Sequence, residues 1–599
     1  MLLNILGGII MKKESVFKRV LTIIMTLILL VPLNLSIKVF AEDKPSNDGI
    51  VLFEGDKFVK GAWGDTWETI TEIPVDDASI YQRPFSLEIN YEGHGAPCAI
   101  FTSWTGGSEW AQVKASYSSK GTAYYTYEAC KEAYGEDFST LNKIIIKPFG
   151  EDVRVTRITL KFNTGEEEIN CDFKGTSGEI FKNIKCGWNL GNTLDCQGDW
   201  IASYSSGTPS DFETAWGNPV TTKATLDKVK AAGFNAIRIP VTWKQHIGDA
   251  STGYKVDEAW MKRVKEVIDF AVQDDFYIIL NLHHDVGTEG WLWATSDSVK
   301  ENSEKFKALW VQIANEFKDY DNKLMFEGFN EILNKECNWD YPGREATTAV
   351  NTLNQIFVDT VRKTGGNNPK RCLIVNTYAT NTNGQVLDEF VLPKDTLENS
   401  LMVQIHFYQP YSYASRINDE WTKQKAWKEN SGKGTVDGIL LNLYKNFSKK
   451  GIPVIMGEFA AASKENTADR AEYASYVVNR AAKHGIKCFW WDEGGKFEAD
   501  EKYGFFTGMA LLNRYTQEWV YPEIVKAFTG QDPNAGEKPV ITKGSGDVNG
   551  DGVVNINDYT LLKKYINTSG DVKINEKEAD VNGDGKMTFL DLLALKAVV

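Results

Sequence analysis

Hydrophobic and polar residues alternate along the first part of the chain, from about residue 48 to 165. The alternation has a period of two and is broken by turn residues, which is typical of antiparallel strands with one buried face. The clearest runs are FSLEINYEG (85–93), CAIFTSW (98–104), NKIIIKPFG (142–150) and VRVTRITLKF (153–162). The pattern predicts a β-sandwich over residues 48–165.

A different pattern follows between residues 178 and 530, where short apolar runs alternate with amphipathic segments. In the segment 258–275, the apolar residues recur at helical spacing and form one face. The apolar runs are IKCGWNLGN (184–192), NAIRIPVTW (235–243), YIILNLHHD (277–285), LMFEGFNEI (324–332), CLIVNTY (372–378), MVQIHFY (402–408), PVIMGEFA (453–460) and KCFWWDEG (487–494). Eight such units predict a (β/α)₈ TIM barrel. A doubly wound open sheet is the alternative, but no Gly-x-Gly-x-x-Gly follows the first run.

The C-terminal part contains an internal repeat. DVNGDGVVNIND (547–558) recurs 33 residues later as DVNGDGKMTFLD (580–591), and a helical run follows each copy. Oxygen-bearing side chains at positions 1, 3, 5, 9 and 12, with Gly at position 6, are typical of a Ca²⁺ loop. The predicted ligands are Asp547, Asn549, Asp551, Asn555 and Asp558 in the first loop and Asp580, Asn582, Asp584, Thr588 and Asp591 in the second. Residues 531–546, which are polar and contain Gly and Pro, are predicted to be a linker to this module of residues 547–599.

The N-terminal residues 1–41 have the organisation of a secretory signal peptide. Basic residues precede the apolar run VLTIIMTLILLVPL (20–33), and the small-residue site Val39-Phe-Ala41 follows. This run is shorter than the ~20 residues that span a bilayer. We expect export and no membrane span in the mature protein, with translation starting at Met1 or Met11.

Composition excludes some partners and leaves others open. The net charge of −15 argues against binding to nucleic acid. The eight Cys residues have no Cys-x-x-Cys spacing, so disulfides and buried thiols remain alternatives. Among 18 Trp and 24 Tyr residues, several fall in the first domain and suit either a sugar-binding surface or a core. They are Trp63, Trp67, Trp104, Trp110 and the cluster Tyr124–Tyr127.

Two acidic residues end barrel runs and are the candidate catalytic pair. Glu331 ends the fourth run and Glu458 the seventh. The C-terminal ends of barrel strands meet at one rim, so both carboxyl groups are expected there. Cleavage of a glycosidic bond uses such a pair: one group donates a proton and the other attacks or activates water.

The same region resembles glycoside hydrolase family 5, a clan A barrel. The residues that carry the resemblance are Asn330-Glu331, Glu458, Arg238 in AIRIP, His283 in NLHHD, His406-x-Tyr408 and Trp490-Trp491. The resemblance implies retention by double displacement, with Glu331 as acid/base and Glu458 as nucleophile. It also implies carboxyl groups about 5–5.5 Å apart. No cofactor or catalytic metal is expected.

The resemblance also implies supporting roles. Asn330 would donate to the sugar 2-hydroxyl, His406 and Tyr408 would orient the carboxylates, and His283 would bind hydroxyls. Trp491 would be the floor under the sugar, with Trp490 as the alternative. Three further residues are assigned to the cleft or the layer beneath it: His284 and Asn192 as cleft-lining candidates and Glu327 as a paired structural carboxylate.

Residues 547–599 resemble a type I dockerin, which implies two Ca²⁺ ions and a cohesin partner on a scaffoldin. Together with the barrel, this predicts a secreted, cellulosome-associated endo-β-1,4-glucanase acting on cellulose-type β-glucan. A family 5 hemicellulase (xyloglucanase, lichenase, mannanase or xylanase) is the enzymatic alternative. An inactive barrel that only displays a polysaccharide-binding module is the non-enzymatic one.

Overall fold

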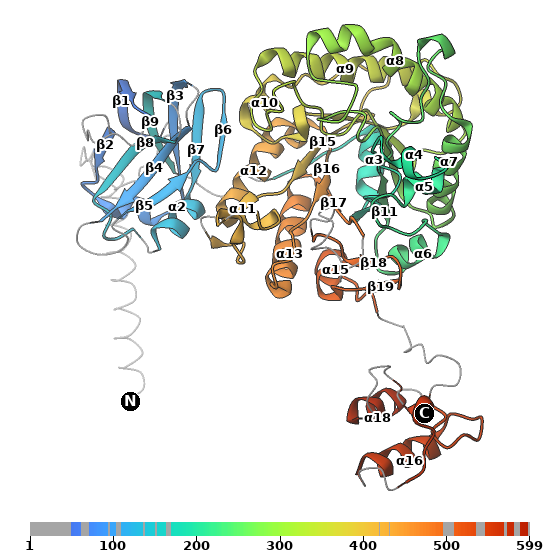
Figure 1. Cartoon of the computed structure of the whole chain (residues 1–599). Coiled ribbons are helices and arrows are strands. Elements are labelled where there is room, and N and C mark those ends of the chain that lie inside the picture. The colour runs from blue at the N-terminus through green and yellow to red at the C-terminus, as the bar shows by residue number, and fades with distance from the viewer. Residues whose placement is uncertain are drawn as a thin grey trace, which may run out of the picture. The chain divides into compact units, whose positions relative to one another are not determined.

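Three folded regions are visible in the computed structural model of the chain (Figure 1). The structure describes residues 49–61, 71–93, 96–103, 110–135, 138–149, 152–162, 169–418, 420–429, 432–494, 508–534, 546–567, 572–579, 581, 588–596 and 599. The predicted signal peptide, Trp63, Trp67, Trp104 and the ligand candidates Asp580, Asn582 and Asp584 lie outside these residues.

The N-terminal region consists of two antiparallel sheets. One has the order β1 (Ile50–Val59), β9 (Val153–Phe162), β3 (Phe85–Gly93), β7 (Thr122–Thr126), β6 (Tyr117–Ser119); the other has the order β2 (Thr71–Pro74), β8 (Lys143–Phe149), β4 (Ala96–Thr102), β5 (Ala111–Lys114). A 3₁₀ helix at Ala78–Gln82 and α2 (Tyr127–Tyr134) complete the region. Alternate residues Phe85, Leu87 and Ile89 of β3 are fully buried, as the period of two predicts. Tyr125 is also fully buried and donates to the carbonyl of Pro97 at 2.6 Å, so this part of the aromatic cluster is core.

The barrel closes through eight parallel strands that neighbour each other in chain order. They are β10 (Gly187–Asn189), β11 (Ala236–Ile239), β12 (Tyr277–Asn281), β13 (Leu324–Glu327), β14 (Leu373–Asn376), β15 (Leu401–Phe407), β16 (Val454–Phe459) and β17 (Ile486–Trp490). Each lies within or next to one of the eight predicted apolar runs. The expectation of a TIM barrel is therefore confirmed.

Helices surround the strands (Figure 1). The longer ones are α3 (Gly175–Asn183), α6 (Lys223–Ala231), α7 (Glu258–Gln273), α8 (Ser296–Glu316), α9 (Arg344–Arg362), α12 (Gly432–Asn446), α13 (Thr467–Lys483) and α15 (Pro522–Thr529). Shorter elements are α4 (Ile201–Tyr204), α5 (Pro209–Glu213), α10 (Gly384–Glu389), α11 (Tyr411–Ala414), β18 (Leu512–Asn513) and β19 (Glu518–Trp519). In α7 the side chain of Asp257 caps the N-terminus, and the predicted apolar face is buried.

The barrel interior changes from apolar to polar along its axis. An apolar layer forms one end, where α3 packs against inward-facing strand residues; its buried members are Ile180, Phe181, Ile184, Ala236, Ile279, Met325, Cys372, Ile374, Met402, Ile455 and Phe489. At Gly187 a Cβ atom would lie 2.0 Å from the ring of Phe489, so the ring needs a glycine there. Two residues further along the strands, the inward positions become polar, as at Arg238, Asn281 and Glu327. The polar inward side chains are thereby placed toward the C-terminal strand ends.

The C-terminal region is small. It contains α16 (Ile556–Asn567), α17 (Glu576–Ala579) and α18 (Phe589–Lys596), and five of its described residues form a buried core. They are Val548, Leu562, Ala579, Leu592 and Leu595. So small a core contributes little to folding.

Two further expectations concern the whole chain. All eight Cys residues are free thiols, and six of them are buried. Within the described ranges, every helix is either too short or too polar for a bilayer span.

Candidate active site

Arg238 is the centre of the charged site. The side chain is fully buried at the end of β11. All five of its N–H groups donate hydrogen bonds. Nε and Nη2 donate to the Glu327 carboxylate at 2.7 and 2.8 Å, and Nη2 also donates to Asn330 at 2.8 Å. Nη1 donates to Asn189 at 3.1 Å and to Glu458 at 2.6 Å. Burial works against this charge, but the carboxylates of Glu327 and Glu458 outweigh it and raise the pKa of Arg238. Glu327 is therefore the paired structural carboxylate that the strand parity predicts.

Glu458 lies within β16, and each of its two carboxylate oxygens accepts a hydrogen bond. Oε1 accepts from Arg238, and Oε2 accepts from the Tyr408 hydroxyl at 2.8 Å. Burial raises the pKa of Tyr408 well above its usual range, so this hydroxyl keeps its proton and donates. Both bonds fix the orientation of the carboxylate and favour its ionised form.

Glu331 lies beyond the end of β13, which stops at Glu327. The side chain is bound by His406, whose Nδ1 is 2.6 Å from Oε1 of Glu331 and 3.4 Å from Oε2 of Glu458. One carboxylate oxygen of Glu331, one of Glu458 and a ring nitrogen of His406 all lie within 4.8 Å of one another. The two acidic residues, far apart in the sequence, thus meet at one point of the rim.

The two carboxyl groups differ in their electrostatic surroundings. Burial raises the pKa of Glu331 to about 7, and Arg238 opposes that shift without bonding to the group. Burial also raises the pKa of Glu458, but here the opposing guanidinium is in direct contact. Burial lowers the pKa of His406 to about 4, so its imidazole is neutral near pH 7. Glu331 is therefore suited to hold a proton and Glu458 to carry a charge.

Two parallel rings form a flat surface at the C-terminal ends of the strands. The ring of Trp491, which directly follows β17, is parallel to that of His283, with ring centroids 5.8 Å apart and an interplanar angle of 4°. Asn330 accepts from Arg238 through Oδ1, which leaves its amide NH₂ as the group that can donate to a ligand. These three residues can hold a sugar ring by stacking and hydrogen bonds.

Trp490 does not belong to this surface, in contrast to the alternative considered from the sequence. Its side chain is fully buried, its indole N–H donates to the carbonyl of Met509 at 2.9 Å, and its ring packs on Phe459 and Phe528. Neighbouring strand residues point to opposite faces, so one Trp of the pair lies in the helical layer and the other at the rim.

His284 and Asn192 lie on the loops of this rim. The His284 ring contacts that of Trp216, with centroids 5.4 Å apart, and burial lowers its pKa to about 4. Asn192 has a positive φ of 54°, and its backbone N–H donates to Asp195 at 3.0 Å. A carboxylate oxygen of Asp195 and ring nitrogens of His283 and His284, which could bind a metal ion, lie within 4.8 Å of one another. However, both oxygens of Asp195 close the turn at Asn192 and Thr193, so we assign no metal there.

Sequence reasoning missed three buried amides that support the predicted residues. Asn189 donates to the carbonyls of Gly457 and Trp490, and Asn281 donates to Glu327 at 2.9 Å. The amide nitrogen of Gln404 lies 3.4 Å from Nε2 of His406. Asn281 and Gln404 each precede a predicted site His by two residues, which is the same face of a strand. That spacing was the available signal.

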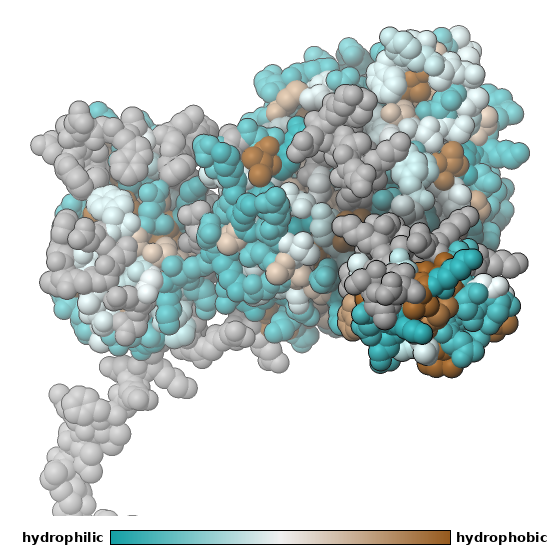
Figure 2. All heavy atoms as spheres, turned by 60° about the horizontal axis from the view of Figure 1, so that its bottom comes forward, coloured by the Kyte–Doolittle hydropathy of each residue, from teal (hydrophilic) through white to brown (hydrophobic). Residues whose placement is uncertain are grey.

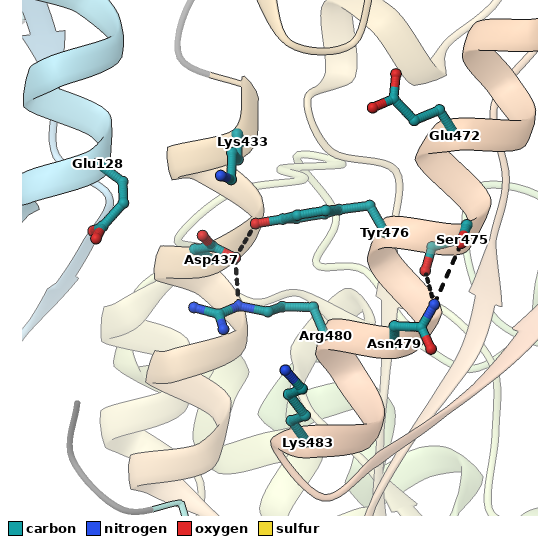
Figure 3. A pocket seen from close by; sticks show the side chains of 9 residues that line it. All are labelled: Glu128, Lys433, Asp437, Glu472, Ser475, Tyr476, Asn479, Arg480 and Lys483. Carbon is teal, nitrogen blue, oxygen red and sulfur yellow. Dashed lines mark hydrogen bonds and ion pairs between the residues drawn. The ribbon is translucent and has the colours of Figure 1, made fainter.

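A hollow of about 500 Å³ elsewhere on the barrel has a different character (Figure 3). It is lined mainly by α12 and α13, where Asp437 accepts from Tyr476 at 2.8 Å and from Arg480 at 2.7 Å. These groups satisfy one another, and no residue of the carboxyl pair lines this space. It carries no catalytic assignment.

The first predicted Ca²⁺ loop is folded with its acidic residues gathered together. Asp547 accepts from the backbone of Gly550, Asp551 and Gly552, and the buried Asp558 accepts from the backbone of Asn549 and Asn555. In the second loop, Asp591 accepts from Thr588 at 2.7 Å. A set of hard oxygen donors fits Ca²⁺, which would link the carboxylates within each loop.

Apolar side chains are exposed on the same C-terminal module (Figure 2). Ile556 and Phe589 hold the tenth position of the two loops, and each is 62% exposed. Val553, three residues before Ile556, and Leu593, four residues after Phe589, are also exposed. An isolated module of this size gains nothing from such surface unless a partner covers it.

Comparisons with known proteins agree with this geometry. Residues 198–497 match the model of cellulase (glycosyl hydrolase family 5), residues 545–599 that of the dockerin type I domain, and residues 53–158 that of carbohydrate binding module 65 domain 1. The N-terminal sandwich is thus similar to a carbohydrate-binding module, and the C-terminal repeat is a dockerin.

Individual relatives cover the barrel. Endoglucanase A of Ruminococcus albus is 39% identical over 354 residues, which are 58% of this chain and 91% of that protein. Cellulase/esterase CelE of Acetivibrio thermocellus is 38% identical over 406 residues, or 65% of this chain. The match spans about half of CelE, 46% of its length.

A solved structure gives the same result. The GH5-4 broad specificity endoglucanase from Ruminococcus champanellensis with bound cellotriose superposes with a TM-score of 0.54 at 39% identity, covering 60% of this chain and 99% of that one. The family model matches half of this chain, and the chain covers 91% of Endoglucanase A, so both comparisons identify the same family. The chain is a glycoside hydrolase that belongs to glycosyl hydrolase family 5.

Proposed function

We propose that the protein is a secreted endo-β-1,4-glucanase that cleaves β-glucan with retention of configuration. The observation that carries the proposal is the meeting of Glu331 and Glu458 within 4.8 Å, bridged by His406. Retaining enzymes place their carboxyl groups about 5–5.5 Å apart, whereas inverting ones leave about 6.5–9.5 Å for a water. The short distance supports the retaining reaction.

In the first step, Glu458 attacks the anomeric carbon and Glu331 gives its proton to the departing glycosidic oxygen. The bond between the sugar and the leaving group breaks as the bond to Oε of Glu458 forms. Arg238 and Tyr408 hold the attacking carboxylate in line, and Asn330 donates to the 2-hydroxyl. The resemblance to family 5 implies these roles, and the direct contact of Glu458 with the Arg238 guanidinium supports them.

In the second step, Glu331 takes a proton from water as that water attacks the same carbon. The glycosyl ester to Glu458 breaks, and both carboxyl groups return to their starting states. His406 stays neutral and keeps contact with both, so it positions them without supplying a charge.

A cellulose-type glucan is the proposed substrate, because the relatives are named endoglucanases and one structural neighbour holds cellotriose. The description of that neighbour as having broad specificity keeps a second candidate in view, namely hydrolysis of xyloglucan or mixed-linkage glucan. Among the alternatives from the sequence, mannan and xylan have no observation in their favour.

The flanking modules would deliver the enzyme to its substrate. We propose residues 1–41 as a signal peptide, 48–165 as a glucan-binding module, 178–530 as the catalytic domain, 531–546 as a linker and 547–599 as a Ca²⁺-dependent dockerin. The exposed Ile556 and Phe589 would contact a cohesin of a scaffoldin. This assignment makes the protein extracellular and cellulosome-associated.

Product analysis tests the proposed activity. The purified chain should release oligosaccharides of mixed length from soluble β-glucan, and NMR of early products should detect the β-anomer first. Xyloglucan, mixed-linkage glucan, mannan and xylan form the comparison panel. An α-anomer as the first product would overturn the retaining mechanism, and no cleavage of any glucan would overturn the proposed function.

A further inference from the structure

Two aromatic rings form an exposed stacked pair on the loop that follows β15. Tyr411 begins α11, and Trp421 begins the 3₁₀ helix Trp421–Lys423. The ring centroids are 5.8 Å apart with an interplanar angle of 27°. Tyr411 is 47% exposed and Trp421 is 58% exposed. Two large rings side by side in water offer a binding surface that burial in the core would have removed.

A buried lysine holds both ends of this loop in place. The ammonium of Lys464, only 3% exposed, donates to the carbonyls of Ser412, Tyr413 and Gln424 at 2.7–3.2 Å. The first two carbonyls belong to the segment that carries Tyr411, and the third to the segment that carries Trp421. In addition, Ser412 donates to the side chain of Gln424 at 2.6 Å. The two rings are therefore presented by a fixed backbone.

Tyr411 follows closely along the chain after a residue of the candidate catalytic site. Tyr408, which binds Glu458, is three residues before Tyr411, so their Cα atoms are at most about 11 Å apart. The carbonyl of Gln409 between them accepts from Tyr473 at 2.9 Å, and Ala462 donates to the carbonyl of Ala414 at 2.9 Å. These bonds anchor the loop to the elements after β16, the strand that holds Glu458.

The position of the loop also fixes which part of a glucan it can meet. Trp491, the expected sugar floor, follows β17 and His283 follows β12, whereas Glu331 and its partner His406 come from β13 and β15. The leaving sugar takes its proton from Glu331. It therefore extends toward the loops that follow β13 to β15, and Tyr411 and Trp421 are on one of these.

We propose that the Tyr411–Trp421 pair is a stacking site for the leaving-group side of the glucan, beyond the bond that is cleaved. The inference rests on the proposed function and adds a specific contact to it. A glucose ring presents an apolar face of C–H groups, and aromatic rings bind such faces. Lys464 joins the backbone segments that carry the two rings.

The test compares two substrates that share the same sugar on the glycone side. One is an aryl cellobioside, which has no sugar on the leaving-group side, and the other is a cello-oligosaccharide long enough to reach the loop. Trp421→Ala should lower kcat/KM on the oligosaccharide by about 3- to 10-fold and leave the aryl cellobioside unchanged. Trp421→Phe, which keeps a ring, should recover most of the loss.

Matched variants make the comparison specific. Tyr411→Ala should shift the ratio of the two kcat/KM values in the same direction. Tyr204→Ala removes a side chain that is 86% exposed on α4, after β10, and should leave the ratio unchanged. Since Trp421 is more than half exposed, its loss should not change the thermal unfolding temperature, which is measured as a folding control.

Two results would overturn the proposal. An unchanged ratio in Trp421→Ala means that the rings do not bind the leaving side. An equal loss on both substrates means that the loop acts on the carboxyl pair instead. Failure of the proposed function itself is distinguishable, because the unaltered enzyme would then be inactive on both substrates.

Discussion

The barrel site and the C-terminal loops both gather acidic side chains, yet they neutralise them differently. In the barrel, Glu327 and Glu458 face the buried guanidinium of Arg238. In the first C-terminal loop, Asp547 and Asp558 meet only backbone N–H groups among the described residues. A buried ion pair is complete once the chain has folded, whereas a cluster of carboxylates still repels itself. The protein itself supplies the counter-charge in the barrel, whereas we propose that an added cation supplies it in the C-terminal loop.

The largest effect should follow the loss of the nucleophile. Glu458→Ala removes the group that we propose forms the covalent intermediate, so turnover should fall to background. Added azide fits the vacated space and should restore part of the activity with an inverted product, detected by NMR. Glu458→Gln, which fills the space, is the matched control and should not respond to azide. Activity near that of the unaltered enzyme in Glu458→Ala would refute the assignment.

Loss of the proton donor should be smaller and should depend on the substrate. Glu331→Ala should reduce kcat/KM on polysaccharide by about 10²–10⁴-fold. Cleavage of activated aryl glycosides, whose leaving groups need no proton, should be largely spared. Comparable losses on both substrates would argue against the acid role.

The same residue should set the alkaline limb of the pH profile. Glu331 must be protonated to act, and burial raises its pKa to about 7. The kcat/KM of the free enzyme on polysaccharide should therefore fall as the pH rises through about 7. Glu331→Ala should lack this limb on aryl glycosides. A limb that stays in place would assign the titration to another group.

Removing the guanidinium tests the charge balance in the barrel. Arg238→Met leaves Glu327 and Glu458 buried without their cation, and should lower the free energy of unfolding by about 3–5 kcal/mol. Denaturant titration gives this value. Arg154→Met, on an exposed ion pair with Asp56, is the control and should change it by less than about 1 kcal/mol. Equal changes in the free energy of unfolding for both variants would contradict the claim that Arg238 balances the buried charges of Glu327 and Glu458.

Chelation tests the other half and should have the smallest effect on catalysis. EDTA should unfold the C-terminal module and abolish cohesin binding while activity on soluble glucan stays constant. Asp547→Ala should behave like EDTA, and Asp532→Ala, at the exposed start of the linker, should not. Circular dichroism and a binding assay report the result. A module that folds and binds equally well in EDTA would remove the proposed requirement for Ca²⁺.

The sequence predicted those features that a period or a spacing encodes. The eight apolar runs overlap the barrel strands because buried parallel strands need continuous hydrophobic stretches. Glu331 and Glu458 could be selected because the ends of such strands converge. Asn189 could not be distinguished from an ordinary turn amide, since its partners lie on other strands. The choice between Trp490 and Trp491 depends on where the strand ends, which periodicity does not fix.

The apolar layer beneath the site affects how water enters the barrel and how the cleaved sugar leaves it. Because α3 and the inward side chains of the described residues fill that end of the barrel with apolar groups, we expect solvent to reach Glu331 and Glu458 from the opposite rim. The water that completes hydrolysis must then enter by the opening through which the detached sugar leaves. A long glucan that remains in place would delay that water, so the sealed end couples product departure to the return of the free enzyme.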